Sequence, residues 1–139
     1  MAHGVFVDTS ALVACAVEKD DRHAEAAAEL LRLLDAGSRL VTSTDVFDET
    51  VTRVRGRAGH RAAVTVGEQL RHSHDIRLVA VTEPHRHAAW GLFVRYADQE
   101  FSLTDCSSMV LAKANGIREV FTFDRGFARV GFTILPRPT

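Results

Sequence analysis

The sequence contains few cysteines and no long apolar run, and both absences exclude classes of protein. Its two cysteines, Cys15 and Cys106, are too few for a disulfide framework and lack the paired short spacing of a zinc site, so we expect two reduced, buried thiols. The longest apolar run, residues 11–17, is far shorter than the ~20 residues of a membrane span, and the first residues lack the basic region of a signal peptide. We therefore expect a cytoplasmic protein that makes no membrane contact.

Neither sign of charge is in excess. The chain has 17 Lys and Arg residues against 18 Asp and Glu residues, which gives a formal net charge of −1. No global basic field would attract a nucleic acid, so such a partner would have to be bound locally, by a site or a metal ion. The chain has 139 residues, of which 46% are hydrophobic, and we expect one domain over residues 1–139.

Short apolar segments alternate with helical segments along the chain. We predict strands at residues 5–7, 40–41, 76–81, 119–123 and 132–135. We predict helices at residues 11–17, 22–35, about 44–56, 60–74, 83–97 and 106–114. This alternation predicts an α/β fold, a three-layer α/β/α domain with a central, mainly parallel five-stranded sheet. Thr9 or Ser10 is expected to cap the first helix, and residues 102–105 have the form of a capping box.

Four acidic residues fall at the ends of these predicted elements. Asp8 directly follows the first strand, and Asp124 directly follows the fourth. Asp105 begins a helix, and Glu49 lies in the first turns of another. In an open parallel sheet, ligands bind outside the carboxyl ends of the strands, and helix N-termini face the same edge. We therefore expect the four carboxylates to converge.

Converging carboxylates favour a bound cation. They repel one another, and each raises the pKa of its neighbours unless a cation neutralises them. A hard divalent cation such as Mg²⁺ or Mn²⁺ prefers oxygen ligands of this kind. Such a metal polarises a phosphodiester, helps to generate hydroxide and stabilises the leaving oxygen. It would also supply the local positive charge that a polyanionic substrate needs.

Each acid also has a simpler structural explanation. Asp8 would cap the helix that follows it, although Thr9 is available for that role. Asp105 would favour a helix start through the macrodipole. Asp124 would occupy a turn, and Glu49 would be a solvated helix residue. Four such coincidences at one predicted edge are less probable than a common site.

The segments that carry these acids resemble a known family. They are residues 7–12, 44–50, 101–106 and 116–127, followed by 131–132 and 135–136. In order and spacing they resemble PIN-domain ribonucleases, and closely the VapC-type toxins of bacterial toxin–antitoxin pairs. The most specific pair is Ser-Leu-Thr-Asp at 102–105 and Thr-Phe-Asp at 122–124.

The resemblance implies a Mg²⁺- or Mn²⁺-dependent endoribonuclease that hydrolyses RNA phosphodiesters. The family's metal-binding and catalytic carboxylates correspond to Asp8, Glu49, Asp105 and Asp124. Its small hydroxyl residues correspond to Ser10 and Thr104, which would hold carboxylates or water in place. The resemblance further implies a homodimer and a small antitoxin protein that blocks the site.

Other functions remain open at this point. One is a catalytically silent PIN module that binds RNA or protein, and another is a solitary RNA-processing nuclease. The presence of all four acids disfavours the silent module. A phosphohydrolase of small phosphoesters is disfavoured because residues 8–10 lack the second aspartate of an Asp-x-Asp motif.

One arginine cluster is a candidate for RNA binding. Arg53, Arg57 and Arg61 follow Glu49 at helical spacing and would share a face able to bind phosphates if the helix continues. The glycines at positions 56 and 59 argue against an unbroken helix.

Two further groups have plain structural interpretations. Asp45 and Asp48, beside Glu49, are expected to be solvated. Trp90 and Phe93 have helical spacing with position 97 and are expected to bury against the sheet or a dimer partner rather than stack on bases.

Overall fold

The computed structural model describes residues 4–138 and contains one five-stranded sheet. The strands are β1 (Gly4–Val7), β2 (Arg39–Ser43), β3 (Ile76–Val79), β4 (Glu119–Phe121) and β5 (Thr133–Leu135). The helices are α1 (Thr9–Ala16), α2 (His23–Asp35), α3 (Thr44–Ala58), α4 (His60–His72), α5 (Glu83–Arg95), α6 (Leu103–Ala114) and α7 (Gly126–Arg129). The strand order is β3-β2-β1-β4-β5, and every pair is parallel.

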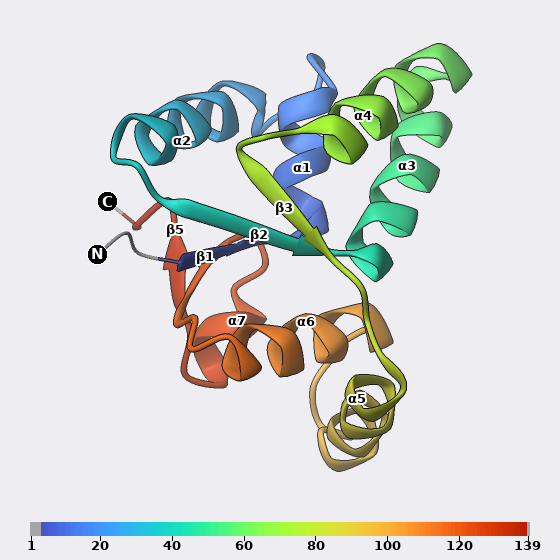
Figure 1. Cartoon of the computed structure of the whole chain (residues 1–139), viewed down its shortest axis with the longest axis vertical. Helices are drawn as coiled ribbons and strands as arrows, with labels where there is room; N and C mark the ends of the chain where they lie inside the picture. Colours follow the sequence, from blue (N-terminus) through green and yellow to red (C-terminus); the bar gives the residue numbers. More distant parts are fainter. Residues whose placement is uncertain (1–3, 139) are drawn as a thin grey trace.

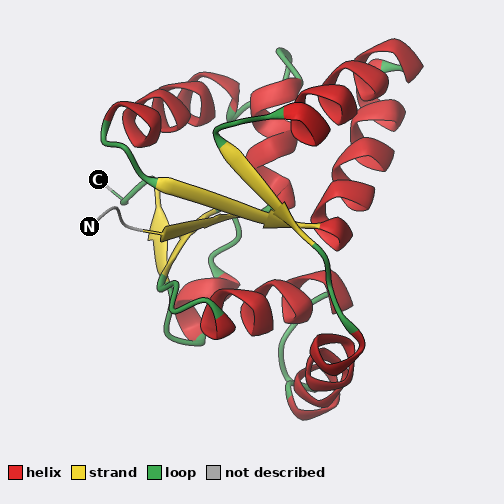
Figure 2. Cartoon of the chain, in the orientation of Figure 1, coloured by secondary structure: helices red, strands yellow, loops and turns green. Residues whose placement is uncertain are grey.

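The helices form two layers around this sheet. Helices α1, α2, α3 and α4 cover one face, and α6 and α7 cover the other, with α5 packed on the outside of α6 (Figure 1). Figure 2 shows the strands enclosed between these two groups of helices. The prediction of a three-layer α/β fold with a central parallel sheet is therefore confirmed.

The centre of the sheet forms the core. Val5, Phe6 and Val7 of β1 are fully buried, as are Val120 and Phe121 of β4. Strands covered on both faces need apolar side chains at every position, which explains why both segments read as continuous apolar runs.

The strand order has a topological switch point between β1 and β4. The chain passes from β1 to β2 on one side, whereas β4 is added on the other side of β1. Val7 pairs with Phe121 at the carboxyl ends of β1 and β4, and the Asp8 amide donates a 3.0 Å hydrogen bond to the Phe121 carbonyl. Such a switch point is where open α/β sheets bind ligands.

The fourth strand is shorter than predicted. It ends at Phe121, so Asp124 does not follow it directly, and Thr122 occupies the first position after the strand. After Thr122, the backbone amides of Phe123 and Asp124 donate to side-chain hydroxyls instead of a neighbouring strand. The four-residue helix α7 was not predicted, because so short a segment carries no helical periodicity.

Trp90 and Phe93 do not bury against the sheet, which corrects one of the two predicted outcomes. They are 56% and 41% exposed on α5 and stack on each other with ring centroids 5.6 Å apart. Helix α5 packs mainly on α6, and this face of the helix is left exposed. Burial against a dimer partner stays a prediction.

Both cysteines are free thiols, as predicted. Cys106 is buried and Cys15 is partly buried. Burial raises the pKa of both thiols, that of Cys15 to about 11, so neither has the thiolate character of a reactive cysteine. Among residues 4–138, no helix has the length and apolar character needed to cross a bilayer.

Candidate active site

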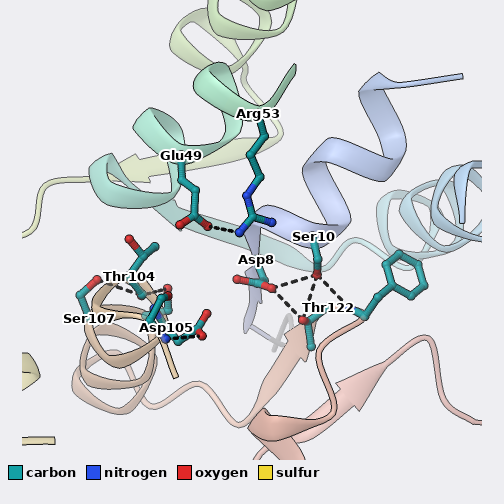
Figure 3. A network of polar contacts seen from close by, with 11 residues as sticks. Asp8, Ser10, Glu49, Arg53, Thr104, Asp105, Ser107 and Thr122 are labelled. Carbon is teal, nitrogen blue, oxygen red and sulfur yellow. Dashed lines mark hydrogen bonds and ion pairs between the residues drawn. The ribbon is translucent and has the colours of Figure 1, made fainter. Parts of the chain in front are cut away.

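The two oxygens of the Asp8 carboxylate have different surroundings. Asp8 is 3% exposed at the end of β1. Its Oδ2 accepts hydrogen bonds from the hydroxyls of Ser10, at 2.9 Å, and Thr122, at 2.8 Å (Figure 3). Its Oδ1 is buried and has no hydrogen-bond partner among the described residues. A buried carboxylate oxygen without a donor is costly, so this atom is a candidate ligand for a cation.

The two hydroxyls are fixed by the backbone. The amide of Phe123 donates to Ser10 Oγ at 2.9 Å, and the amide of Asp124 donates to Thr122 Oγ1 at 2.9 Å. Each hydroxyl therefore accepts from an amide and directs its own proton to Asp8. The hypothesis that Ser10 supports a carboxylate agrees with this geometry.

This arrangement corrects the predicted cap of α1. Asp8 occupies the N-cap position, but its side chain makes no capping hydrogen bond. Thr9 and Ser10 are the first residues of the helix, and the Ser10 hydroxyl is directed to Asp8. The simple explanation of Asp8 as a helix cap is therefore wrong.

Thr122 is a residue of this site that sequence reasoning did not select. It lies at the first position after β4, one strand away from Asp8, and is 2% exposed. The sequence feature that could have selected Thr122 is a hydroxyl residue directly after a buried strand. The sequence does not reveal its hydrogen-bond partner, because Asp8 lies 114 positions away.

Asp105 is part of a helix capping box and has a raised pKa. The Ser102 amide donates to Asp105 Oδ2 at 2.9 Å, and the Asp105 amide donates to Ser102 Oγ at 3.0 Å, which confirms the capping box. The pKa of Asp105 is raised to about 6, mainly by burial and in smaller part by the negative charges of Asp8 and Asp124, while its hydrogen bonds with Ser102 oppose the shift. The three aspartates are thus close enough to interact.

Burial also raises the pKa of Asp8. The hydrogen bonds from Thr122 and Ser10 oppose this effect, and the charge of Asp124 adds to it. A cation among these carboxylates would lower the pKa of both Asp8 and Asp105, because it favours the ionised forms.

Asp124 and Glu49 complete the set of predicted acids. Asp124 Oδ1 accepts a 2.8 Å hydrogen bond from the Gly126 amide, so the predicted turn role is also present. Glu49 forms an ion pair with Arg53 at 3.6 Å, one turn along α3, with 24% of its side chain exposed. In Figure 3, Asp8 lies between Glu49 and Asp105 on one side and the Ser10–Thr122 pair on the other.

The acids surround the carboxyl edge of the sheet without forming a compact cluster. Within residues 4–138, no three His, Cys, Asp or Glu side chains lie close enough together to hold a metal ion as they stand. The donor chemistry nevertheless fits a hard divalent cation, since Asp8 Oδ1 is a buried carboxylate oxygen without a hydrogen-bond donor, and the charges of Asp8 and Asp124 add to the effect of burial in raising the pKa of Asp105.

Comparison with known proteins identifies the family. The sequence profile of the PIN domain matches residues 5–133. The chain belongs to the PIN-domain family.

Relatives of this PIN domain include a characterised toxin. The chain is 36% identical over 129 residues to the 23S rRNA-specific endonuclease VapC20 of Mycobacterium tuberculosis strain H37Rv, covering 92% of this chain and 95% of the relative. The crystal structure of Mycobacterium tuberculosis VapC20, described as a Sarcin-Ricin loop cleaving toxin, matches with a TM-score of 0.83, 34% identity and coverage of 92% and 95%. The resemblance to VapC-type toxins is confirmed.

Two more distant structures share the fold. VapBC2 from Rickettsia felis, bound to a promoter DNA fragment, has a TM-score of 0.68 at 13% identity and covers 94% of this chain and 96% of its own. FitAcB from Neisseria gonorrhoeae has a TM-score of 0.67 at 19% identity and covers 94% and 95%.

The predicted arginine face of this PIN domain does not form. Helix α3 ends at Ala58, and Gly59, with a φ of 95°, separates it from α4, which carries Arg61. Arg53 pairs with Glu49, and Arg57 pairs with Asp20 in the loop before α2. The three arginines therefore lie on two helices, and two of them are engaged by acids. Their contact with RNA stays a prediction.

Asp45 is not the solvated residue that was expected. Its side chain is 17% exposed and accepts a 2.9 Å hydrogen bond from Ser107 Oγ. It also forms an ion pair with Arg86 at 3.4 Å. Ser107 Oγ also lies 3.0 Å from the Thr104 carbonyl, beside Asp105. Asp45 thus connects the start of α3 to the start of α6, the two helices that carry Glu49 and Asp105. The Thr104 side chain's predicted supporting role stays a prediction.

Proposed function

We propose that this PIN domain is a Mg²⁺- or Mn²⁺-dependent endoribonuclease of the VapC toxin type, which hydrolyses RNA phosphodiester bonds. The observation that carries this proposal is the Asp8 carboxylate. It is buried at the switch point of the sheet, with Oδ2 held by two hydroxyls and Oδ1 left without a donor. The VapC20 relative, an endonuclease specific for 23S rRNA, supports the same class of substrate.

The metal ligands would come from the four carboxylates at this edge. Asp8, Glu49, Asp105 and Asp124 would bind the cation directly or through water. The bound cation would supply Lewis-acid chemistry toward the phosphodiester and the attacking water.

The remaining residues have positioning roles. Ser10 and Thr122 orient Asp8 and keep its Oδ2 from rotating toward solvent, because both hydroxyls are themselves fixed by amides. Ser10 donates to Asp8 and accepts from the Phe123 amide, so we assign its hydroxyl to positioning. The attacking group in this proposal is water, and no covalent enzyme intermediate is invoked.

We infer the partners from the same assignment. Ribosomal RNA that contains the sarcin–ricin loop is the first substrate to test, because VapC20 acts on it. As in the toxin–antitoxin pairs that the sequence resembles, we expect a small antitoxin protein that blocks the site, a homodimer, and action in the cytoplasm.

The decisive experiment compares cleavage of 23S rRNA by four proteins. These are the wild type, Asp8→Asn, Asp105→Asn and the control Asp35→Asn, whose carboxylate is exposed at the end of α2. With Mg²⁺ or Mn²⁺, the wild type and Asp35→Asn should cleave the RNA, and chelation should abolish cleavage. The two site variants should lose more than about a hundredfold in rate, the upper range for loss of an outer-shell partner.

Other results would contradict the assignment. Equal cleavage by the wild type and both site variants would show that these carboxylates are not the catalytic ones. RNA binding without cleavage of any RNA would favour the silent binding module. If no short reading frame precedes or overlaps the gene, the solitary RNA-processing nuclease becomes the better description.

A further inference from the structure

A cavity of about 230 Å³ lies beside the candidate active site, where the chain leaves β4 and β5. Thr122, which donates to Asp8, forms part of its wall. Three arginines from distant parts of the sequence line the cavity, Arg22, Arg125 and Arg137. We refer to it as the arginine cavity.

One wall of the arginine cavity combines an aromatic ring with a guanidinium group. The Arg22 guanidinium carbon lies 5.3 Å from the centroid of the Phe123 ring, over its face. The Phe123 amide donates to Ser10, so the ring is attached directly to the network that holds Asp8. Aromatic faces and guanidinium planes are the two surfaces on which unpaired RNA bases stack.

The arginine cavity has an excess of positive charge in a chain whose net charge is −1. Among its described lining residues the acid is Glu25, which pairs with Arg22 at 3.2 Å. Arg137 approaches Glu119 only to 3.7 Å, and its side chain is 72% exposed. Arg22 and Arg137 are thus engaged by acids, as Arg53 and Arg57 of α3 are, but the lining of the cavity brings three guanidinium groups together against one carboxylate.

We propose that the arginine cavity binds a nucleotide of the RNA substrate adjacent to the phosphodiester that is cleaved. Arg22, Arg125 and Arg137 contact the phosphate oxygens, for which the planar guanidinium group is well matched. The Phe123 ring stacks on the base. The proposal rests on the proposed ribonuclease function and adds to it the surface that positions the RNA relative to Asp8.

Phosphate contacts can be tested by their salt dependence. All variants carry Asp8→Asn to prevent cleavage, and anisotropy measures their affinity for a short mixed-sequence RNA and a sarcin–ricin hairpin at several salt concentrations. Arg22→Ala and Arg137→Ala should each weaken binding about tenfold and reduce the salt slope by about one. Arg71→Ala, on an exposed residue in the last turn of α4, is the matched control and should change neither quantity.

Stacking has a separate signature. Phe123→Leu keeps an apolar side chain but removes the ring, and it should weaken binding about tenfold without changing the salt slope. Phe123→Tyr should retain the affinity. Melting temperatures of all variants, measured without RNA, would show that each loss arises from binding and not from unfolding.

The outcomes separate this proposal from the function on which it rests. If the wild type cleaves RNA while Arg22→Ala and Arg137→Ala, in the Asp8→Asn background, bind RNA as Arg71→Ala does, the arginine cavity is not an RNA site and the ribonuclease assignment stands. If the wild type neither binds nor cleaves RNA, both proposals fail. If the arginine variants keep their RNA affinity but lose affinity for a polyglutamate peptide, the cavity binds an acidic protein segment instead.

Discussion

At the scale of single residues, burial has a larger effect on the site carboxylates than any one neighbour does. Desolvation is the main cause of the raised pKa of both Asp8 and Asp105. The hydroxyls of Ser10 and Thr122 act in the opposite direction on Asp8. Without a metal, Asp8 and Asp105 therefore hold their protons more tightly in the folded protein than in the unfolded chain.

This difference predicts how stability depends on pH. The pKa of Asp105 is raised from its ordinary value of 3.8 to about 6, so its contribution to stability is complete below about pH 4 and is lost as pH rises through 6. In a metal-free buffer, Asp105→Asn should lack this part of the pH dependence. At pH 8 it should melt no lower than the wild type, because the substitution relieves repulsion. Thermal melts between pH 4 and pH 8 measure the effect.

A second substitution controls for the helix cap. Asparagine can still accept from the Ser102 amide, whereas Asp105→Ala removes that acceptor and should be less stable than Asp105→Asn by about 1 kcal/mol at every pH. A melting temperature of Asp105→Asn well below that of the metal-free wild type at pH 8 would contradict the repulsion argument.

Thr122 provides a prediction about positioning. Thr122→Val keeps the shape of the side chain but removes one of the two donors to Asp8 Oδ2 and the acceptor of the Asp124 amide. We expect metal affinity to fall about 10- to 100-fold, as for other outer-shell partners, and Thr122→Ser to restore most of it. Titration calorimetry with Mn²⁺ measures this directly. Equal affinities of the valine and serine variants would show that the hydroxyl has no such role.

At the scale of elements, the turn between β4 and α7 positions one carboxylate through close packing. A Cβ atom at Gly126 would lie 2.7 Å from the Phe101 ring and 3.0 Å from Asp124 Oδ1. The Gly126 amide also donates to that same oxygen. Because glycine has no Cβ atom, α7 can begin in close contact with Phe101 and Asp124.

Gly126→Ala should consequently lower the free energy of unfolding by about 1–3 kcal/mol, as overpacking does elsewhere, and should reduce RNA cleavage by moving Asp124. Gly56→Ala is the matched control, because a Cβ there meets nothing within 4 Å inside α3. That variant should gain about 0.5–1 kcal/mol. Denaturant unfolding of both proteins tests the pair, and similar stabilities would contradict the packing argument.

At the scale of the whole molecule, metal binding should couple the site to global stability. The acids come from the ends of β1, α3, α6 and the β4–α7 turn, so one cation would connect both helical layers across the sheet edge. At a hundredfold excess over its Kd, Mg²⁺ should stabilise the wild type by about 2.7 kcal/mol. Asp8→Asn should show almost none of this gain, and Asp35→Asn should show all of it. Equal gains in Asp8→Asn would place the metal elsewhere.

The architecture could be predicted from the sequence because its signals are local. Apolar runs marked each strand, helical spacing marked each long helix, and the capping box at residues 102–105 is present as predicted. The acids at strand and helix ends could be expected to share one edge, because parallel strands end together. One domain over residues 1–139 and the homodimer stay predictions.

The details of the candidate site depend on contacts between residues far apart in the chain. The Thr122 hydroxyl reaches Asp8 only because β4 pairs with β1, and Arg57 is engaged only because α3 lies beside the loop that holds Asp20. Local periodicity and capping involve a few neighbouring residues, so composition and spacing reveal them. Hydrogen bonds and ion pairs between distant segments require the packed sheet and its helices, and these contacts distinguish a free carboxylate oxygen or a free arginine from one that is already bound.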